Sequence, residues 1–132
     1  GKVAGILLES VGDHLAIGIG VNLAHAPEAS TLEARALPAV TLREAGANVT
    51  AEDFLNVLAQ EYAGLETQFT TYGFAAIRSA WLAHAARLGE VITARTMRDE
   101  ITGVFEDVDS AGNLILRTRD GAVPITAADV FF

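Results

Sequence analysis

The stretch that decides the fold is residues 2–22, which read KVAGILLESVGDHLAIGIGVN. An apolar run at residues 3–8 is followed by a turn-rich segment at residues 10–14 and a second apolar run at residues 15–19. Apolar runs of this length, separated by turn-forming residues, predict a hairpin of two largely buried strands.

Glycine and lysine make this hairpin unusual. Gly18 and Gly20 stand on alternate positions, so one face of the second strand lacks side chains and lets a flat ligand lie against the backbone. Lys2 stands at the mouth of the hairpin, and all the other residues counted among the nine basic ones are arginines. One primary ammonium beside a glycine-bared strand indicates a chemical role. The alternative is an exposed lysine whose stem lies along apolar surface.

Composition limits the classes of protein to consider. The 132 residues are enough for one domain, or one domain with a small appendage. Hydrophobic residues make up 51%, but no run approaches the roughly 20 residues that span a bilayer, so no membrane partner is expected. A net charge of −8 argues against nucleic acid as a partner. The absence of cysteine excludes thiolate metal sites and fits a cytoplasmic location.

The middle of the chain begins with a loop and continues with helical spacing. Residues 24–39 lack sustained periodicity and are expected to form a long loop beside the glycine-rich strand. A short helical patch is expected at residues 42–45. Thr50 should then cap a longer helix. The apolar stripe of that helix is expected to face the core, and consists of Phe54, Leu58, Tyr62, Leu65 and Phe69.

A second amphipathic helix is predicted at residues 74–88, with Gly89 as its end and Trp81 in the core. From residue 90 the period becomes strand-like. Short strands are predicted at residues 91–96, 101–108, 114–118, 122–125 and 130–132. Several short strands in so short a segment favour a small SH3-like barrel docked on the first part of the chain.

Three motifs do not support a site. The spacing Gly18-x-Gly20 would need a third glycine at Leu23 to match a dinucleotide-binding fingerprint. A calcium loop starting at Asp107 would need a glutamate at Thr118. The three histidines, which lack metal-ligand spacing, are His14, His25 and His84. No metal site is therefore predicted from protein side chains.

Several segments resemble the biotin protein ligases. Residues 2–9, KVAGILLE, and residues 17–23, IGIGVNL, are similar to the family's KxAGIL…E and GxGxN segments. Residues 42–46 resemble its post-loop segment, and Trp81 with Leu88 and Gly89 resembles its junction between helix and barrel. Residues 103–109 resemble its small C-terminal domain. The resemblance covers essentially the whole chain and implies an α+β fold.

The resemblance implies an enzyme with a two-step reaction. Biotin and MgATP give biotinyl-5′-AMP, and a lysine of the biotin carrier domain of a carboxylase then takes the biotinyl group. The family's catalytic lysine falls on Lys2. Its ammonium suits the negative charge that builds at the biotin carboxylate and the α-phosphate, and a point charge on a flexible stem suits both better than a guanidinium.

The resemblance also assigns the residues of the hairpin to a pocket. Gly5, Gly18 and Gly20 would line the site of biotin and its adenylate through their backbone, and Val21 would form an apolar wall. Asn22 would lie near the nucleotide phosphates or their magnesium.

Other parts of the family pattern do not occur in these residues. The family's glycine- and arginine-rich loop, and strands that supply much of the biotin pocket, precede the lysine motif. Since the chain begins without methionine, one residue before Lys2, we expect further sequence upstream. Residues 1–89 are then the C-terminal half of a catalytic domain and residues 90–132 an SH3-like domain, in a fragment expected to be inactive alone.

Two other functions fit the same residues. One is a noncatalytic domain that keeps the ligase fold but binds a partner or a small acid. The other is an acyltransferase similar to the lipoate ligases, which the size of the pocket would distinguish. A homodimer is a further partner to consider.

Overall fold

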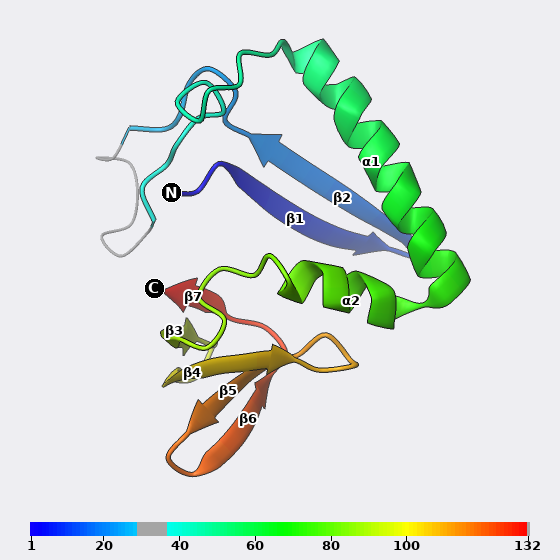
Figure 1. Cartoon of the computed structure of the whole chain (residues 1–132). Helices are drawn as coiled ribbons and strands as arrows, with labels where there is room; N and C mark the ends of the chain where they lie inside the picture. Colours follow the sequence, from blue (N-terminus) through cyan, green and yellow to red (C-terminus); the bar gives the residue numbers. More distant parts are fainter. Residues whose placement is uncertain (29–36, 132) are drawn as a thin grey trace. The chain divides into compact units, whose positions relative to one another are not determined.

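A computed structural model describes residues 1–28 and 37–131, and its helices and strands are labelled in Figure 1. The described residues contain both helices and antiparallel sheets, so the predicted α+β class is confirmed. The chain divides into two compact units, Gly1–Leu58 and Ala59–Phe132. Part of the predicted loop at residues 24–39, namely residues 29–36, lies outside the described residues.

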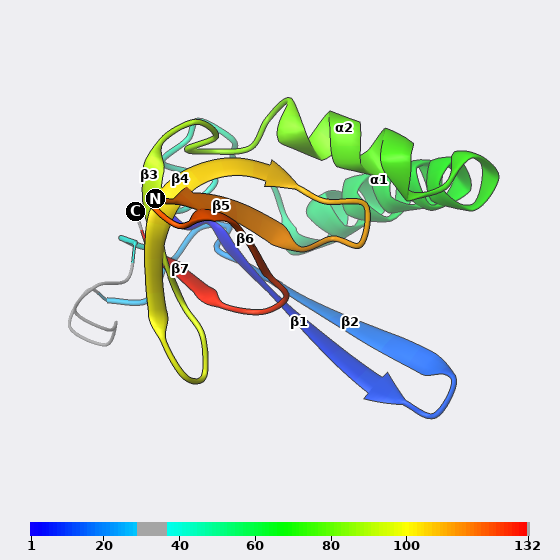
Figure 2. The same cartoon turned by 90° about the horizontal axis from the view of Figure 1, so that it is seen from below.

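The predicted hairpin is confirmed. Strands β1 (Ala4–Val11) and β2 (His14–Val21) form a two-stranded hairpin (Figure 2). They pair antiparallel along their whole length, and Gly5 is opposite Gly20. A two-residue turn joins them, and Gly12 adopts a φ of 58°, which glycine adopts at little cost. The predicted strands are thus extended up to the turn.

The expectation that the hairpin strands are largely buried is wrong for this chain. Directly opposite residues of an antiparallel pair lie on the same face, so one face is almost entirely apolar. Its apolar members are Ala4, Ile6, Leu8, Leu15, Ile17, Ile19 and Val21. Ile6 is 68% exposed and Leu8 is 59% exposed, because no described layer of the chain covers them. A contiguous apolar face of this kind is typical of a surface that another layer covers.

Residues 37–47 run past the start of the hairpin and form turns. Lys2 and Ala39 form an isolated parallel bridge. At the predicted helical patch the amide of Gly46 donates to the carbonyl of Arg43, and that of Ala47 donates to the carbonyl of Leu42. The segment is therefore a series of hydrogen-bonded turns rather than a regular helix.

Helix α1 (Ala51–Tyr72) begins where predicted. The Thr50 hydroxyl accepts the Asp53 amide at 3.1 Å and donates to the Asp53 carboxylate at 2.7 Å, which is a capping box. The expectation that its apolar stripe faces a core is wrong within this chain. Leu65 is 47% exposed and Phe69 is 50% exposed, and no residue of α1 is buried.

Helix α2 (Phe74–Leu82) is shorter than predicted. After Leu82 the chain makes single turns, in which the His84 amide bonds to the Trp81 carbonyl. Arg87 has a φ of 64°, which ends the helical path before Gly89. The Gly89 amide then donates to the carbonyl of Phe105, so the backbone at Gly89 is bonded to the sheet and not to the helix.

The five predicted short strands are confirmed with small shifts of their ends. They form one antiparallel sheet in the order β6-β5-β4-β3-β7. Their bounds are β3 (Val91–Arg95), β4 (Glu100–Val108), β5 (Leu114–Thr118), β6 (Gly121–Ile125) and β7 (Asp129–Phe131). Gly103 allows close packing of β4 on β5, because a Cβ there would lie 2.7 Å from the Arg117 carbonyl oxygen.

The buried apolar core lies in this sheet. Its residues are Ile92, Ala94, Phe105, Leu116 and Ile125. The prediction that Trp81 is a core residue is wrong, since this side chain is 55% exposed. Its ring lies against the core from α2, with its centroid 6.2 Å from that of Phe105. The helix is thus attached to the sheet by a ring contact at the margin of the core.

Candidate functional site

The backbone of Lys2 is held by residues 38–40. Its amide donates to the Pro38 carbonyl at 2.8 Å, and its carbonyl accepts the Val40 amide at 3.1 Å. Its side chain is exposed and makes no ion pair within residues 1–28 and 37–131. The structure therefore holds the main chain of Lys2 and leaves its ammonium available to a ligand.

Asn22 connects the same segments from the end of β2. Its side-chain amide nitrogen donates to the Lys2 carbonyl at 3.3 Å and to the Val40 carbonyl at 3.1 Å. Its backbone amide donates to the Val3 carbonyl, and its own carbonyl accepts the Leu42 amide. Both side-chain N–H groups are thus used inside the protein. The side-chain oxygen accepts no bond from the described residues, and this acceptor is what Asn22 can offer to a ligand.

The three hairpin glycines are not required by the fold of the described residues. Gly5, Gly18 and Gly20 are extended, and none has a positive φ. A Cβ at Gly20 would have its nearest neighbour, the Gly5 carbonyl oxygen, at 4.0 Å, and a Cβ at Gly18 would lie 3.7 Å from the Leu7 carbonyl oxygen. Side chains would therefore fit at these positions, so the glycines leave open a surface that the chain itself does not fill.

Lys2 lies over this glycine surface. A Cβ built on Gly5 would lie 3.9 Å from Cε of Lys2, and Gly5 is directly opposite Gly20. Since opposite residues share a face, Lys2, Gly5 and Gly20 belong to one face of the hairpin, together with Gly18. We call these four residues the glycine face. The structure thus brings together four of the six site residues predicted from sequence.

Val21 does not share this arrangement. Successive side chains of a strand point to opposite faces, so Val21 lies on the apolar face opposite the glycine face. Its side chain therefore lies on the other side of the strand from the face that Gly18 and Gly20 share.

A protein-built metal centre is not found here. Among the residues that the structure describes, no three or more His, Cys, Asp and Glu residues are grouped so that they could hold a metal ion. No helix within that part of the chain is long and apolar enough to cross a membrane.

Two residues next to the site were not predicted from sequence. Thr41 is only 5% exposed, and Glu44 accepts hydrogen bonds from its amide and hydroxyl. The signal that could have found them is the spacing Thr-x-x-Glu, which is typical of a capping box. This spacing normally precedes a helix, whereas residues 42–46 form turns.

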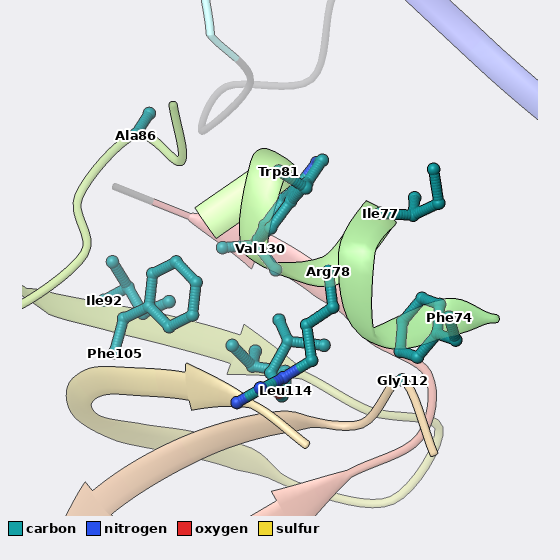
Figure 3. Close-up of a pocket in the computed structure, with 11 residues that line it drawn as sticks. Phe74, Ile77, Arg78, Trp81, Ala86, Ile92, Phe105, Gly112, Leu114 and Val130 are labelled. Carbon is teal, nitrogen blue, oxygen red and sulfur yellow. Dashed lines mark hydrogen bonds between the residues drawn. The ribbon is translucent and has the colours of Figure 1, made fainter. Parts of the chain in front are cut away.

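The second unit contains a separate apolar cavity of about 620 Å³ between α2 and the sheet (Figure 3). Phe74 and Trp81 line it from the helix, and Ile92 and Leu114 line it from the strands. Arg78 also lines it, but its guanidinium is paired with Asp107 and the Val108 carbonyl. With its cationic group already paired, this cavity offers no set of polar groups that would orient a reacting molecule.

Two comparisons of the sequence find similarity to biotin protein ligases. The family described as "Biotin protein ligase C terminal domain" matches residues 88–132. A biotin–[acetyl-CoA-carboxylase] ligase from Paracoccus denitrificans is 54% identical over 138 aligned positions, which include all of this chain and 58% of that protein.

Solved structures show the same fold. The crystal structure of biotin protein ligase from Aquifex aeolicus matches with a TM-score of 0.83 and 23% identity, over 98% of this chain and 58% of that one. The structure of that ligase in complex with biotin and ATP matches with a TM-score of 0.78 and covers 98% of this chain and 54% of its own.

This chain shares its fold with the biotin protein ligase from Aquifex aeolicus. The chain resembles biotin protein ligases over its whole length, and its residues 88–132 match the C-terminal domain of that family. It spans about 58% of the length of the curated relative that it matches.

Proposed function

We propose that this chain supplies the catalytic lysine, the glycine face and the small C-terminal domain of an ATP-dependent biotin–protein ligase. The observation that carries the proposal is the position of Lys2, whose Cε lies over Gly5 on a face where the fold does not require glycine. In the 54% identical relative from Paracoccus denitrificans, the whole protein is a biotin–[acetyl-CoA-carboxylase] ligase. Residues 90–132 would be the SH3-like domain, after a partial catalytic domain at residues 1–89.

The proposed reaction has two steps. In the first, a carboxylate oxygen of biotin attacks the α-phosphorus of ATP, so a carboxyl–phosphate bond forms and pyrophosphate leaves. In the second, the ε-amine of a carrier lysine attacks the biotinyl carbonyl. An amide bond forms, the amine loses a proton to solvent, and AMP leaves with the phosphate oxygen.

The task of Lys2 follows from charge. Biotin carboxylate and the α-phosphate are both anionic, and they must approach each other before the new bond forms. An ammonium between them lowers their repulsion and stabilises the negative charge of the transition state. Gly5, Gly18 and Gly20 leave room for the ring system or the adenylate to lie close to the strand backbone.

The contacts that Asn22 can make with the nucleotide are restricted by its hydrogen bonds within the protein. Because both N–H groups of its side chain bond to carbonyls, Asn22 has no donor left for a phosphate oxygen. Its remaining oxygen suits a nitrogen donor of the ligand or a cation. A Mg²⁺ ion carried by the ATP phosphates would neutralise their charge, and the Asn22 oxygen is the group at this site that could contact it.

The partner proposed for the second step is a biotin carrier domain of a carboxylase. The apolar face of the hairpin would be covered by the additional length that the relatives possess. A ligase of this kind works where ATP and the carboxylase are present, so the proposal includes a cytoplasmic location.

The test uses the whole protein that contains these residues. ATP–pyrophosphate exchange is measured with biotin, lipoate or octanoate, and transfer to a carrier domain is followed by mass spectrometry. The proposal predicts exchange with biotin and a biotinylated carrier lysine. Exchange with lipoate instead would support the acyltransferase alternative. Biotin binding without exchange would support a noncatalytic binding domain.

A further inference from the structure

Two residues outside the glycine face, Thr41 and Glu44, are hydrogen-bonded to each other next to the segment to which Lys2 is bonded. Glu44 Oε2 accepts the Thr41 amide at 2.7 Å and the Thr41 hydroxyl at 3.0 Å. In return, the Thr41 hydroxyl accepts the Glu44 amide at 3.0 Å. Three hydrogen bonds between one pair of residues close the turn that starts at Thr41.

This closed turn is adjacent to the backbone partner of Lys2. Val40 precedes Thr41 and donates its amide to the Lys2 carbonyl at 3.1 Å, while the Val40 carbonyl accepts the side chain of Asn22 at 3.1 Å. A change in the direction of the chain at Thr41 would therefore move Val40, and with it the main chain of Lys2. Lys2 in turn places its side chain over Gly5.

The usual reason for such a pair does not apply. A capping box starts a helix by satisfying its first free amides, but residues 42–46 form turns and no helix. Thr41 is nevertheless the buried polar residue of the described chain, at 5% exposed, and its side chain is fully hydrogen-bonded. Thr41 is buried and Glu44 is exposed, so the pair ties a buried residue next to Val40 to a surface carboxylate without starting a helix.

We propose that Thr41 and Glu44 are positioning residues for the catalytic lysine. They hold Val40 in register with Lys2 and so keep the Lys2 ammonium over the glycine face. This inference rests on the proposed function, because it assigns to Lys2 the charge stabilisation of adenylate formation. Neither residue is expected to touch biotin or ATP.

The chain contains a matched control. Thr50 and Asp53 make the same kind of reciprocal pair, with the hydroxyl accepting the Asp53 amide at 3.1 Å and donating to its carboxylate at 2.7 Å. That pair starts α1, and none of its hydrogen bonds in the described chain leads to Lys2 or Val40. Removing the carboxylate deletes two hydrogen bonds from Thr41 at Glu44 and one from Thr50 at Asp53, and only Thr41 adjoins Val40, the backbone partner of Lys2.

The experiment compares Glu44→Ala, Glu44→Gln and Asp53→Ala in the whole ligase, each alone and combined with Lys2→Ala. We expect Glu44→Ala to lower kcat for biotin-dependent pyrophosphate exchange at least tenfold, with the KM for biotin changed less than threefold. Glu44→Gln keeps an acceptor oxygen and should recover most of the rate. Asp53→Ala should leave kcat within about twofold of the unaltered protein. It should lower the melting temperature about as much as Glu44→Ala does.

The combined variants separate positioning from a general loss of structure. If Glu44 acts through Lys2, Glu44→Ala should lower the residual rate of the Lys2→Ala protein by less than about twofold. The inference would be overturned if Glu44→Ala still lowered the rate tenfold in the Lys2→Ala protein. It would also be overturned if Asp53→Ala lowered kcat as much as Glu44→Ala does. If Lys2→Ala itself left the rate unchanged, the proposed function would fail instead, so the two failures are distinguishable.

Discussion

Asn22 donates its side-chain amide to the backbone carbonyl of Lys2, 20 residues earlier in the chain, at 3.3 Å. The same nitrogen donates to the Val40 carbonyl, so one side chain joins three segments at the start of the hairpin. Sequence reasoning placed Asn22 against the nucleotide. The structure gives its donors to the protein and leaves one oxygen for a ligand, which makes Asn22 a support of the site as well as a candidate contact.

The change Asn22→Asp tests this dual role. Aspartate has the same shape but no N–H donor, and its carboxylate would face the carbonyls of Lys2 and Val40. We expect the free energy of unfolding to fall by about 1–3 kcal/mol, together with a loss of adenylation. Urea unfolding and pyrophosphate exchange measure the two effects. Asn56→Asp on the exposed surface of α1 is the control, and equal effects from both variants would contradict the assignment.

Gly20→Val tests the glycine face. Gly20 is extended and a Cβ there has its nearest neighbour at 4.0 Å, so we expect the variant to fold. The added side chain would occupy the face on which biotin is proposed to lie, and the affinity for biotin should fall at least a hundredfold, by about 3 kcal/mol. Calorimetry with biotin and circular dichroism measure binding and folding separately. Unchanged affinity in a folded variant contradicts the pocket.

Two other glycines serve as controls for that measurement. Gly64→Ala on α1 meets no neighbour within 4 Å and should leave biotin binding unchanged. Gly103→Ala should destabilise the five-stranded sheet, because its Cβ would lie 2.7 Å from the Arg117 carbonyl oxygen.

Acid should weaken the support of Lys2. Hydrogen bonds from the Thr41 amide and then the Thr41 hydroxyl lower the pKa of Glu44 below its ordinary value of 4.5. A lowered folded-state pKa means that this contribution to stability is present above pH 4.5 and is lost as the pH falls through the folded-state value. Asp109 should also contribute stability that is lost in acid, because hydrogen bonds from the side chain and amide of Asn113 lower its pKa.

The pH effect is measured by urea unfolding of the protein and of its Glu44→Gln variant, at about pH 6 and about pH 3. The difference in unfolding free energy between the two proteins should shrink at the lower pH, because the glutamine cannot titrate. A difference that stays constant over this range would contradict the role given to the Glu44 carboxylate.

The elements that could be predicted from sequence are those with local signals. The hairpin followed from two apolar runs and the turn at Gly12, the start of α1 followed from Thr50 and Asp53, and the five strands followed from their alternation. The end of α2 at Leu82 could not be predicted, because the helical spacing of apolar residues continues to Leu88.

Site contacts depended more on tertiary structure. Lys2 and the glycines were identified because their residue types are unusual where they stand. The roles of Thr41 and Glu44 depend on Val40 lying beside Lys2, which no local pattern indicates. The side of the strand on which Val21 lies could have been found from simple alternation with Gly20.

Residues 1–132 alone are expected to make no appreciable biotinyl-AMP. The relatives that match are longer, and the exposed apolar face and strand edges of the hairpin favour association with another copy. Purified 1–132 should therefore self-associate in light scattering and show no biotin-dependent pyrophosphate exchange. Adding the remaining part of the ligase in trans should restore exchange. Full activity of a monomeric 1–132 would contradict this prediction.

The most direct test of the central claim is the rate of biotin-dependent ATP–pyrophosphate exchange in the whole protein with Lys2→Arg. Arginine keeps the positive charge, but its planar fork cannot replace a compact ammonium over Gly5 between two anions. Loss of such charge stabilisation typically lowers kcat by roughly a hundredfold or more. We expect a loss of that size with an unchanged melting temperature, and a rate within about threefold of the unaltered protein would contradict the role proposed for Lys2.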